Sequence, residues 1–175
     1  GKLLVRRGLF AEAEEYFRTA VKSLTWKNPN PYDSEAYYQL GVALKYQGRL
    51  EAAFAAFYKA VWSAAWQDTG YFSLAQIATE QGNLQEALEL VERSLTRNTR
   101  NYKARTLLTA LNRRLGKLAE AADEIKLTKK LDRLEFGAHF EEYLLLQAQG
   151  DEAGAAEALQ ALIALMRRAP HNYVT

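Results

Sequence analysis

The sequence predicts an all-α protein of about five helix–turn–helix repeats, because strong internal repetition is combined with a composition that suits helices. The 175 residues are rich in Ala, Leu, Glu and Arg but include only three prolines and ten glycines, which favours helices over strands. A fixed period in the range of about 20–50 residues is typical of repeat architectures. Hydrophobic residues make up 49% and charged residues 25%, so the chain has enough apolar surface to fold and is not expected to be disordered.

The repeat is marked by glycines 34 residues apart, each followed five residues later by an alanine. A glycine between two apolar-periodic segments predicts the end of a helix, because glycine adopts positive φ without a Cβ penalty. The alanine falls in the next helix, where a small side chain lets two helices approach closely. The glycines are Gly48, Gly82, Gly116 and Gly150, with Gly8 preceding them by 40 residues; the alanines are Ala13, Ala53, Ala87, Ala121 and Ala155.

This pattern predicts two helices in each repeat, and each helix has one apolar face with residues at i, i+4 and i+7. One pair cannot bury both faces alone, so the pairs must stack on their neighbours. An insertion at 25–34 interrupts the period, where Pro29 and Pro31 prevent a helix and Asp33 or Ser34 can cap the next one. Pro170 is expected to stop the last helix. The predicted helices span about 2–7, 10–24, 35–47, 50–66, 68–81, 84–96, 101–115, 118–131, 136–149 and 151–168.

The clearest unit covers residues 36–67 and carries Tyr37, Leu40, Gly41, Gly48, Ala53, Phe57 and Ala60 in this register. On these residues, the chain resembles the tetratricopeptide repeat family over nearly its whole length. The resemblance implies a single right-handed α-solenoid over 1–175, with repeats at about 1–24, 35–67, 68–101, 102–135 and 136–168. We expect the chain to be part of a longer protein, because its first repeat is truncated and its tail is too short to cap an apolar end.

Two repeats depart from the pattern of the family. The fourth has Arg105, Thr109 and Asn112 at positions of its first helix that are usually aromatic or small, and the fifth has Glu142 and Tyr143. These departures leave the period intact but predict different side-chain packing in the last two repeats.

Stacked repeats present a concave groove lined by the first helix of each unit, and the resemblance implies that this groove binds a peptide or a partner segment. The chaperone-binding members of the family clamp a C-terminal carboxylate with Lys, Asn and Arg. Because the matching places here include Val42 and Phe72, we do not expect that clamp. Helical phase predicts the following groove residues: Tyr38, Val42, Lys45, Tyr46, Phe72, Gln76, Glu80, Arg113, Arg114 and Phe140.

Positive charge gathers in one stretch, although the net charge of the chain is only +2. Residues 93–133 hold twelve lysines and arginines against four acidic residues, which predicts a surface for an anionic ligand or an acidic partner. A solvated face is the alternative, with cations such as Arg97 satisfying carbonyl groups at helix ends. The predicted basic surface comprises Arg93, Arg97, Arg100, Lys103 and Arg105.

An aromatic stripe is predicted where Tyr58, Trp62 and Trp66 follow each other at i, i+4 and i+8 on the helix expected at 50–66. Exposed phenol and indole groups are common anchors for a partner protein or a sugar ring. In the alternative, the stripe packs on Trp26 and Tyr32 of the insertion.

No residue pattern points to catalysis, and we expect neither an enzyme nor a bound cofactor or metal. The chain has no cysteine and only two histidines, which excludes disulfides, thiolate zinc sites and cysteine nucleophiles. It also lacks a glycine-rich phosphate loop, a paired-histidine metal motif and a nucleophile elbow. Because His139 continues the repeat position of Tyr37 and Tyr71, its expected role is packing against an adjacent helix.

Two segments, residues 55–68 (AAFYKAVWSAAWQD) and 93–105 (RSLTRNTRNYKAR), carry a second resemblance. They are similar to the C-terminal tetratricopeptide region of bacterial proteins that have an N-terminal mutarotase-like β-sandwich domain of unknown function. This resemblance implies a carbohydrate-related protein, in which the helical part scaffolds, dimerises or helps to shape a glycan site.

The main functional hypothesis is a non-catalytic scaffold that binds a protein, a peptide or a neighbouring domain of the same chain. The alternative is an accessory module of a bacterial carbohydrate-active or sugar-binding protein, with a glycan ligand at Tyr58, Trp62 and Trp66. The third is nucleic-acid binding through 93–133, which is disfavoured because Tyr102 is the only aromatic residue there for base stacking. A homo-oligomer is compatible with all three. No stretch approaches the roughly 20 apolar residues of a membrane span, so we expect no membrane contact and a cytoplasmic location.

Overall fold

The computed structural model describes residues 1–28 and 33–168, and this part of the chain is folded into ten α-helices and one short 3₁₀ helix without strands. The predicted all-α class is therefore confirmed. The chain divides into two compact units, Gly1–Asn98 and Thr99–Thr175. The expectations for Pro29, Pro31, Tyr32 and Pro170 fall outside the described residues, and the single solenoid over 1–175 stays a prediction.

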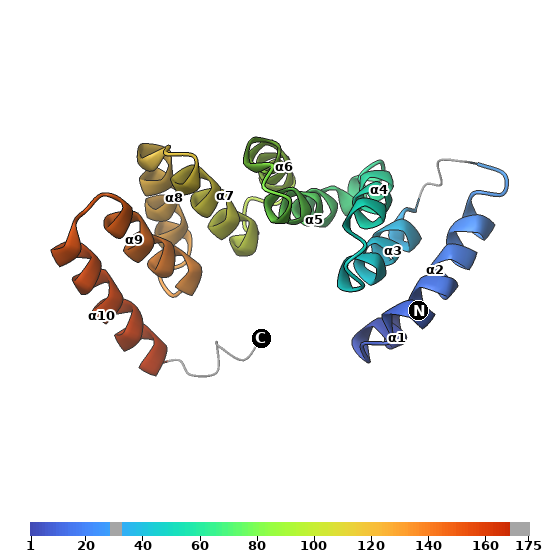
Figure 1. Cartoon of the computed structure of the whole chain (residues 1–175), viewed down its shortest axis with the longest axis horizontal. Coiled ribbons are helices and arrows are strands. Elements are labelled where there is room, and N and C mark those ends of the chain that lie inside the picture. The colour runs from blue at the N-terminus through green and yellow to red at the C-terminus, as the bar shows by residue number, and fades with distance from the viewer. Residues whose placement is uncertain (29–32, 169–175) are drawn as a thin grey trace. The chain divides into compact units, whose positions relative to one another are not determined.

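The first unit is built of antiparallel helix pairs joined by short turns (Figure 1). Within it, α2 packs on α3, α3 on α4, α4 on α5, and α5 on α6. Each helix thus covers the apolar face of the one before it, as stacked repeats require. The elements are α1 (Lys2–Arg6), α2 (Phe10–Leu24), α3 (Glu35–Tyr46), α4 (Leu50–Ala60), η1 (Ala64–Trp66), α5 (Gln67–Glu80) and α6 (Leu84–Arg97).

The second unit repeats this arrangement with four helices. Here α7 packs on α8, α9 packs on α10, and α9 also contacts both α7 and α8. A core of Ala121, Ile125 and Leu145 joins α8 to α9. The bounds are α7 (Tyr102–Arg114), α8 (Leu118–Leu131), α9 (Phe136–Ala148) and α10 (Glu152–Arg168).

The repeated glycines end helices as the sequence predicted. All five have positive φ, between 74° and 81°. At Gly48, the backbone N–H donates to the Lys45 carbonyl at 2.9 Å, and the next N–H donates to the Leu44 carbonyl at 3.0 Å. This pair of bonds is the Schellman motif, which satisfies the free carbonyls of a helix end. The alanine five residues after each glycine is buried in every repeat, which confirms the predicted close approach of the two helices.

The helix predicted at 50–66 is wrong after Ala60, where α4 ends. The Gln67 side chain donates to the Val61 carbonyl at 3.1 Å, so this carbonyl keeps a hydrogen bond although the helix ends. Gly70 of α5 lies against Val61 so closely that an added Cβ would come within 2.5 Å of it. After this break, Trp66 turns toward α3 and stacks on Tyr38. Tertiary contacts thus override a locally helical sequence.

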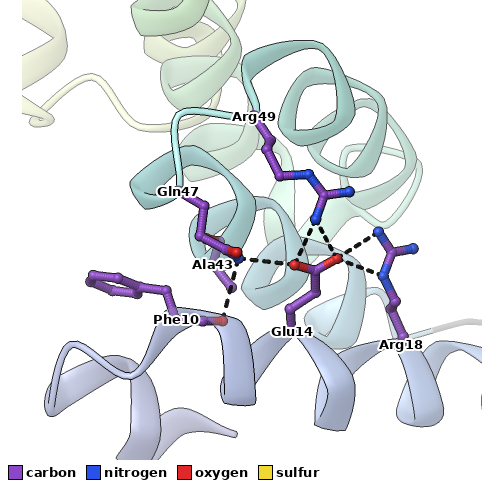
Figure 2. Close-up of polar contacts among 6 residues, drawn as sticks. All are labelled: Phe10, Glu14, Arg18, Ala43, Gln47 and Arg49. Carbon is purple, nitrogen blue, oxygen red and sulfur yellow. Dashed lines mark hydrogen bonds and ion pairs between the residues drawn. The ribbon is translucent and has the colours of Figure 1, made fainter.

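A buried carboxylate fastens α2 to the turn between α3 and α4 (Figure 2). Glu14 accepts hydrogen bonds from Arg49 Nη1 at 2.8 Å, Gln47 Nε2 at 2.9 Å and Arg18 Nε at 2.7 Å. Burial by itself would raise the pKa of Glu14, but these hydrogen bonds outweigh it and hold the pKa of the carboxyl below its ordinary value. The charged form of Glu14 is therefore the one that stabilises this junction.

Replacing Glu14 by glutamine is expected to lower the free energy of unfolding at pH 7 by about 1–2 kcal/mol, because charge-assisted hydrogen bonds are lost. A lowered folded-state pKa stabilises the protein above the unfolded-state value and loses that contribution as the pH falls through the folded-state value. The difference between the variant and the wild type should therefore disappear in acid. Urea unfolding at several pH values measures it, with Glu15→Gln, at an exposed neighbour, as the control. If the difference in unfolding free energy persists unchanged in acid, the charged form of Glu14 is not what stabilises this junction.

Candidate functional site

A pocket of about 580 Å³ lies between the facing sides of α3 and α5 in the first unit. It combines aromatic, apolar and charged side chains from both helices. Its lining residues are Tyr38, Val42, Lys45, Tyr46, Gly48, Phe57, Ser73, Gln76 and Glu80. Six of these are among the predicted groove residues of α3 and α5.

Two tyrosines of the pocket are held in place by other aromatic rings. Tyr46, which is 68% exposed, stacks on Phe10 of α2 with ring centroids 4.7 Å apart and planes 9° apart. Tyr38 stacks on Trp66 at 4.8 Å and also contacts the buried ring of Phe57 at 5.4 Å. These contacts limit the rotamer freedom of both side chains, so a ligand would lose less entropy by ordering them.

The polar end of the pocket is a three-residue cluster that joins the two helices. Lys45 Nζ donates to Gln76 Oε1 at 3.0 Å and lies 3.4 Å from the Glu80 carboxylate. The ammonium of Lys45 is thus already neutralised within the protein. Gln76 uses only its oxygen in this bond, which leaves its amide N–H groups to donate to a ligand.

Three residues of the pocket were not predicted as groove residues: Gly48, Phe57 and Ser73. Gly48 and Phe57 were assigned to a helix end and to the core, and both also line the cavity. Ser73 lies three residues before Gln76, so an i, i+3, i+7 phase on α5 would have identified it. Its neighbour Phe72, a predicted groove residue, is half-buried on α5 and does not line the pocket.

The remaining predicted groove residues belong to the second unit. Arg113 Nε donates to the buried carboxylate of Glu141 at 3.0 Å. Arg114 is exposed at the end of α7, and Phe140 is exposed on α9, where its ring lies 6.3 Å from that of Tyr143. Arg113 is therefore engaged in an internal ion pair, while the other two are accessible.

The predicted basic surface needs one correction. Arg105 is 7% exposed, donates through Nε to the Thr99 carbonyl at 2.7 Å and forms an ion pair with Glu124 of α8. It occupies the repeat position that Tyr37 and Tyr71 hold in earlier units, and a buried guanidinium there requires the pairing that Glu124 supplies. Arg93, Arg97, Arg100 and Lys103 are exposed, so the basic surface without Arg105 stays a prediction.

The predicted aromatic stripe on one helix is wrong, because Tyr58 lies on α4 and Trp66 on the separate 3₁₀ helix. Trp66 stacks on Tyr38 and donates to Asp33 Oδ1 at 3.3 Å. Tyr58 and Trp62 are about half exposed, and Lys59 Nζ lies 4.0 Å above the Trp62 ring. Trp26, the alternative packing partner of the stripe, is 80% exposed.

Within residues 1–28 and 33–168, no three His, Cys, Asp or Glu side chains are grouped so that they could hold a metal ion. The described helices include none with the length and apolarity that crossing a bilayer needs.

His139 binds through Nε2 to the Arg133 carbonyl at 3.0 Å, in the turn that precedes its own helix.

A family model described as tetratricopeptide repeat matches residues 1–69 and 71–133. The chain belongs to the tetratricopeptide repeat family. Its repeats in both units thus share the family's helix–turn–helix unit, and the glycine turns and buried alanines described above are this chain's version of it.

Several solved tetratricopeptide proteins have a similar fold. MamA from Desulfovibrio magneticus is 21% identical with a TM-score of 0.79, over 95% of this chain and 91% of that one. A tetratricopeptide repeat protein from Parabacteroides merdae is 22% identical with a TM-score of 0.82, over 94% of this chain and 63% of that one. YrrB, described as having an unusual peptide-binding site, is 17% identical with a TM-score of 0.75, over 95% of this chain and 82% of that one. At these identities, the likeness shows the fold.

Proposed function

We propose that the protein is an interaction scaffold that binds an extended segment of a partner protein in the pocket between α3 and α5. The observation that carries this proposal is the pocket itself. Tyr38 and Tyr46, each stacked on another aromatic ring, line it together with Val42, and the polar cluster of Lys45, Gln76 and Glu80 forms its other end. Membership of the tetratricopeptide repeat family and the peptide-binding site described for YrrB support the same function.

The chemistry of the pocket defines the segment that it fits. Tyr38, Val42 and Tyr46 offer apolar and aromatic surface for one large apolar side chain. The amide of Gln76 can donate to a backbone carbonyl of an extended chain. Because Glu80 neutralises Lys45, the site has little net charge, and we expect it to select a neutral segment instead of a terminal carboxylate.

The test is a peptide selected from a displayed random library on the full chain and then measured by fluorescence anisotropy. Val42→Arg is expected to weaken its binding at least tenfold, because a charged side chain would fill the apolar wall without a partner. Glu89→Arg, at an exposed position of α6, is the control and should bind as the wild type does. Because the pocket has little net charge, affinity should change less than about threefold between low and high salt. Equal binding by Val42→Arg and the wild type would refute the proposal.

The alternatives have weaker support from the described residues. For a glycan, Trp66 is engaged with Tyr38, and Lys59 covers one face of Trp62. For a nucleic acid, three cations of the stretch 93–133 are used in internal ion pairs, namely those of Arg105, Arg113 and Lys129. Both alternatives stay hypotheses.

A further inference from the structure

An exposed leucine ridge runs along the end of α8 and the turn that follows it. Leu127, Leu131 and Leu134 are 43%, 40% and 55% exposed, at i, i+4 and i+7. Leu127 and Leu131 lie on one face of the helix because four residues are about one turn apart. Leu134 follows three residues later, within about 10 Å along the chain. Exposed leucines at helical spacing are typical of a surface that another molecule covers.

Three cations accompany the leucines, each one residue before a leucine: Lys126, Lys130 and Arg133. The other basic residues of the second unit include Arg105, Arg113 and Lys129, and these pair with Glu124, Glu141 and Glu142. In contrast, no carboxylate among the described residues pairs with Lys130 or Arg133, and Lys126 has only a loose contact with Asp123 at 3.7 Å, where both side chains are about four-fifths exposed. Lys130 and Arg133 therefore have no carboxylate partner among the described residues, whereas the carboxylates of Asp132 and Glu135 in the same turn accept backbone N–H groups.

The turn that carries Arg133 and Leu134 is held in one conformation. Asp132 Oδ1 accepts from the Leu134 N–H at 2.8 Å, and the Arg133 carbonyl binds His139 Nε2 at 3.0 Å. Glu135 then caps α9 by accepting from the Ala138 N–H at 2.6 Å. Leu134 is thus kept exposed by a turn that these hydrogen bonds hold in place, which is a pre-organised surface and not a frayed helix end.

We infer that this ridge, made of residues 126, 127, 130, 131, 133 and 134, docks a second protein segment whose apolar side chains are flanked by carboxylates. Carboxylates are the groups that complement Lys130 and Arg133, and the leucines require apolar contacts between them. This surface is distinct from the pocket between α3 and α5 and belongs to the other unit, so the inference does not depend on the proposed function.

Two other occupants fit less well. If two copies paired antiparallel so that Leu127 met Leu131, the Lys130 ammonium groups of the two copies would lie at nearly the same height and repel each other. A membrane with anionic lipids would meet Glu120 and Asp123, which are exposed on the preceding turns of the same helix. A flat membrane has to meet these acidic residues together with the cations, so they would repel its lipid headgroups, whereas a protein segment can place its carboxylates beside Lys130 and Arg133 alone.

The experiment uses a labelled 18-residue helical peptide with leucines at i, i+4, i+7 and i+11 flanked by glutamates, and a second peptide with lysines in their place. Fluorescence anisotropy with the full chain should show binding of the glutamate peptide, at least tenfold tighter than the lysine peptide and weakened by salt. The double variant Lys130→Glu, Arg133→Glu should reverse this preference. Leu127→Ser combined with Leu131→Ser should weaken binding at least tenfold.

The matched control is Arg167→Glu with Arg168→Glu, which reverses two exposed cations of α10 in the same unit and should change the affinity less than twofold. Val42→Arg should also leave it unchanged, which separates this result from the test of the pocket. Equal binding of both peptides by the wild type, loss of binding in Val42→Arg, or tighter binding to phosphatidylserine vesicles than to the glutamate peptide would each overturn the inference.

Discussion

Replacing Phe57 by alanine is expected to lower the free energy of unfolding by about 3–5 kcal/mol, as deletion of a fully buried phenylalanine does. Phe57 is 1% exposed and fills the space between α3 and α4. Its ring lies so close to Gly41 that an added Cβ there would come within 2.7 Å of it. It also contacts Tyr38 and lines the pocket, so the same change should weaken peptide binding.

Urea unfolding measures the first effect, with Tyr58→Ala as the control on the adjacent, half-exposed residue of α4. The control should cost less than about 1 kcal/mol, the usual range for surface positions. Gly41→Ala tests the contact from the other side, and its cost should be smaller in a Phe57→Leu background than in the wild type. An unfolding free energy of Phe57→Ala equal to that of the control would contradict the packing described for the first unit.

Replacing Glu124 by alanine is expected to cost about 3–5 kcal/mol, because it leaves the buried Arg105 guanidinium without its counter-charge. Glu124 also accepts from Thr128 Oγ1 at 3.4 Å, so a second buried group loses a partner. Arg105 keeps its bond to the Thr99 carbonyl at 2.7 Å, but a neutral carbonyl does not compensate a buried positive charge. The second unit should therefore be destabilised far more than by loss of a surface ion pair.

The control is Asp123→Ala, the neighbouring residue, whose carboxylate is exposed and lies 3.7 Å from Lys126 Nζ. Pairs of this kind contribute about 0–1 kcal/mol. The double variant Arg105→Met, Glu124→Leu removes both charges and should be less destabilised than Glu124→Ala alone. If the double variant is less stable than Glu124→Ala, the attraction within the ion pair contributes more to stability than the cost of leaving Arg105 buried without a counter-charge.

Most of the secondary structure could be predicted because the repeat signal rests on backbone requirements. Positive φ at Gly48, Gly82 and the other repeated glycines is nearly a glycine property, and the buried alanines follow from helix spacing. The pocket residues on α3 could be placed for the same reason, since helical phase is fixed once the glycine at the end of the helix is known.

The errors lie where specific side-chain contacts, and not the helical period, decide the structure. The end of α4 at Ala60 depends on the Gln67 side chain and on the stacking of Trp66 on Tyr38. The burial of Arg105 depends on Glu124, nineteen residues away. Local periodicity predicts neither the end of α4 nor the burial of Arg105. A charged residue in a helix is usually solvated, and an aromatic residue at i+4 usually continues the helix.

The most direct test of the proposed function is the map of amide chemical-shift changes in the full chain when the selected peptide is added. If the partner segment binds in the pocket, the largest changes occur at Tyr38, Val42 and Tyr46 of α3 and at Ser73, Gln76 and Glu80 of α5, and the end of α8 shows none. Changes confined to α8, or to Tyr58 and Trp62, would show that the pocket between α3 and α5 is not where the partner segment binds.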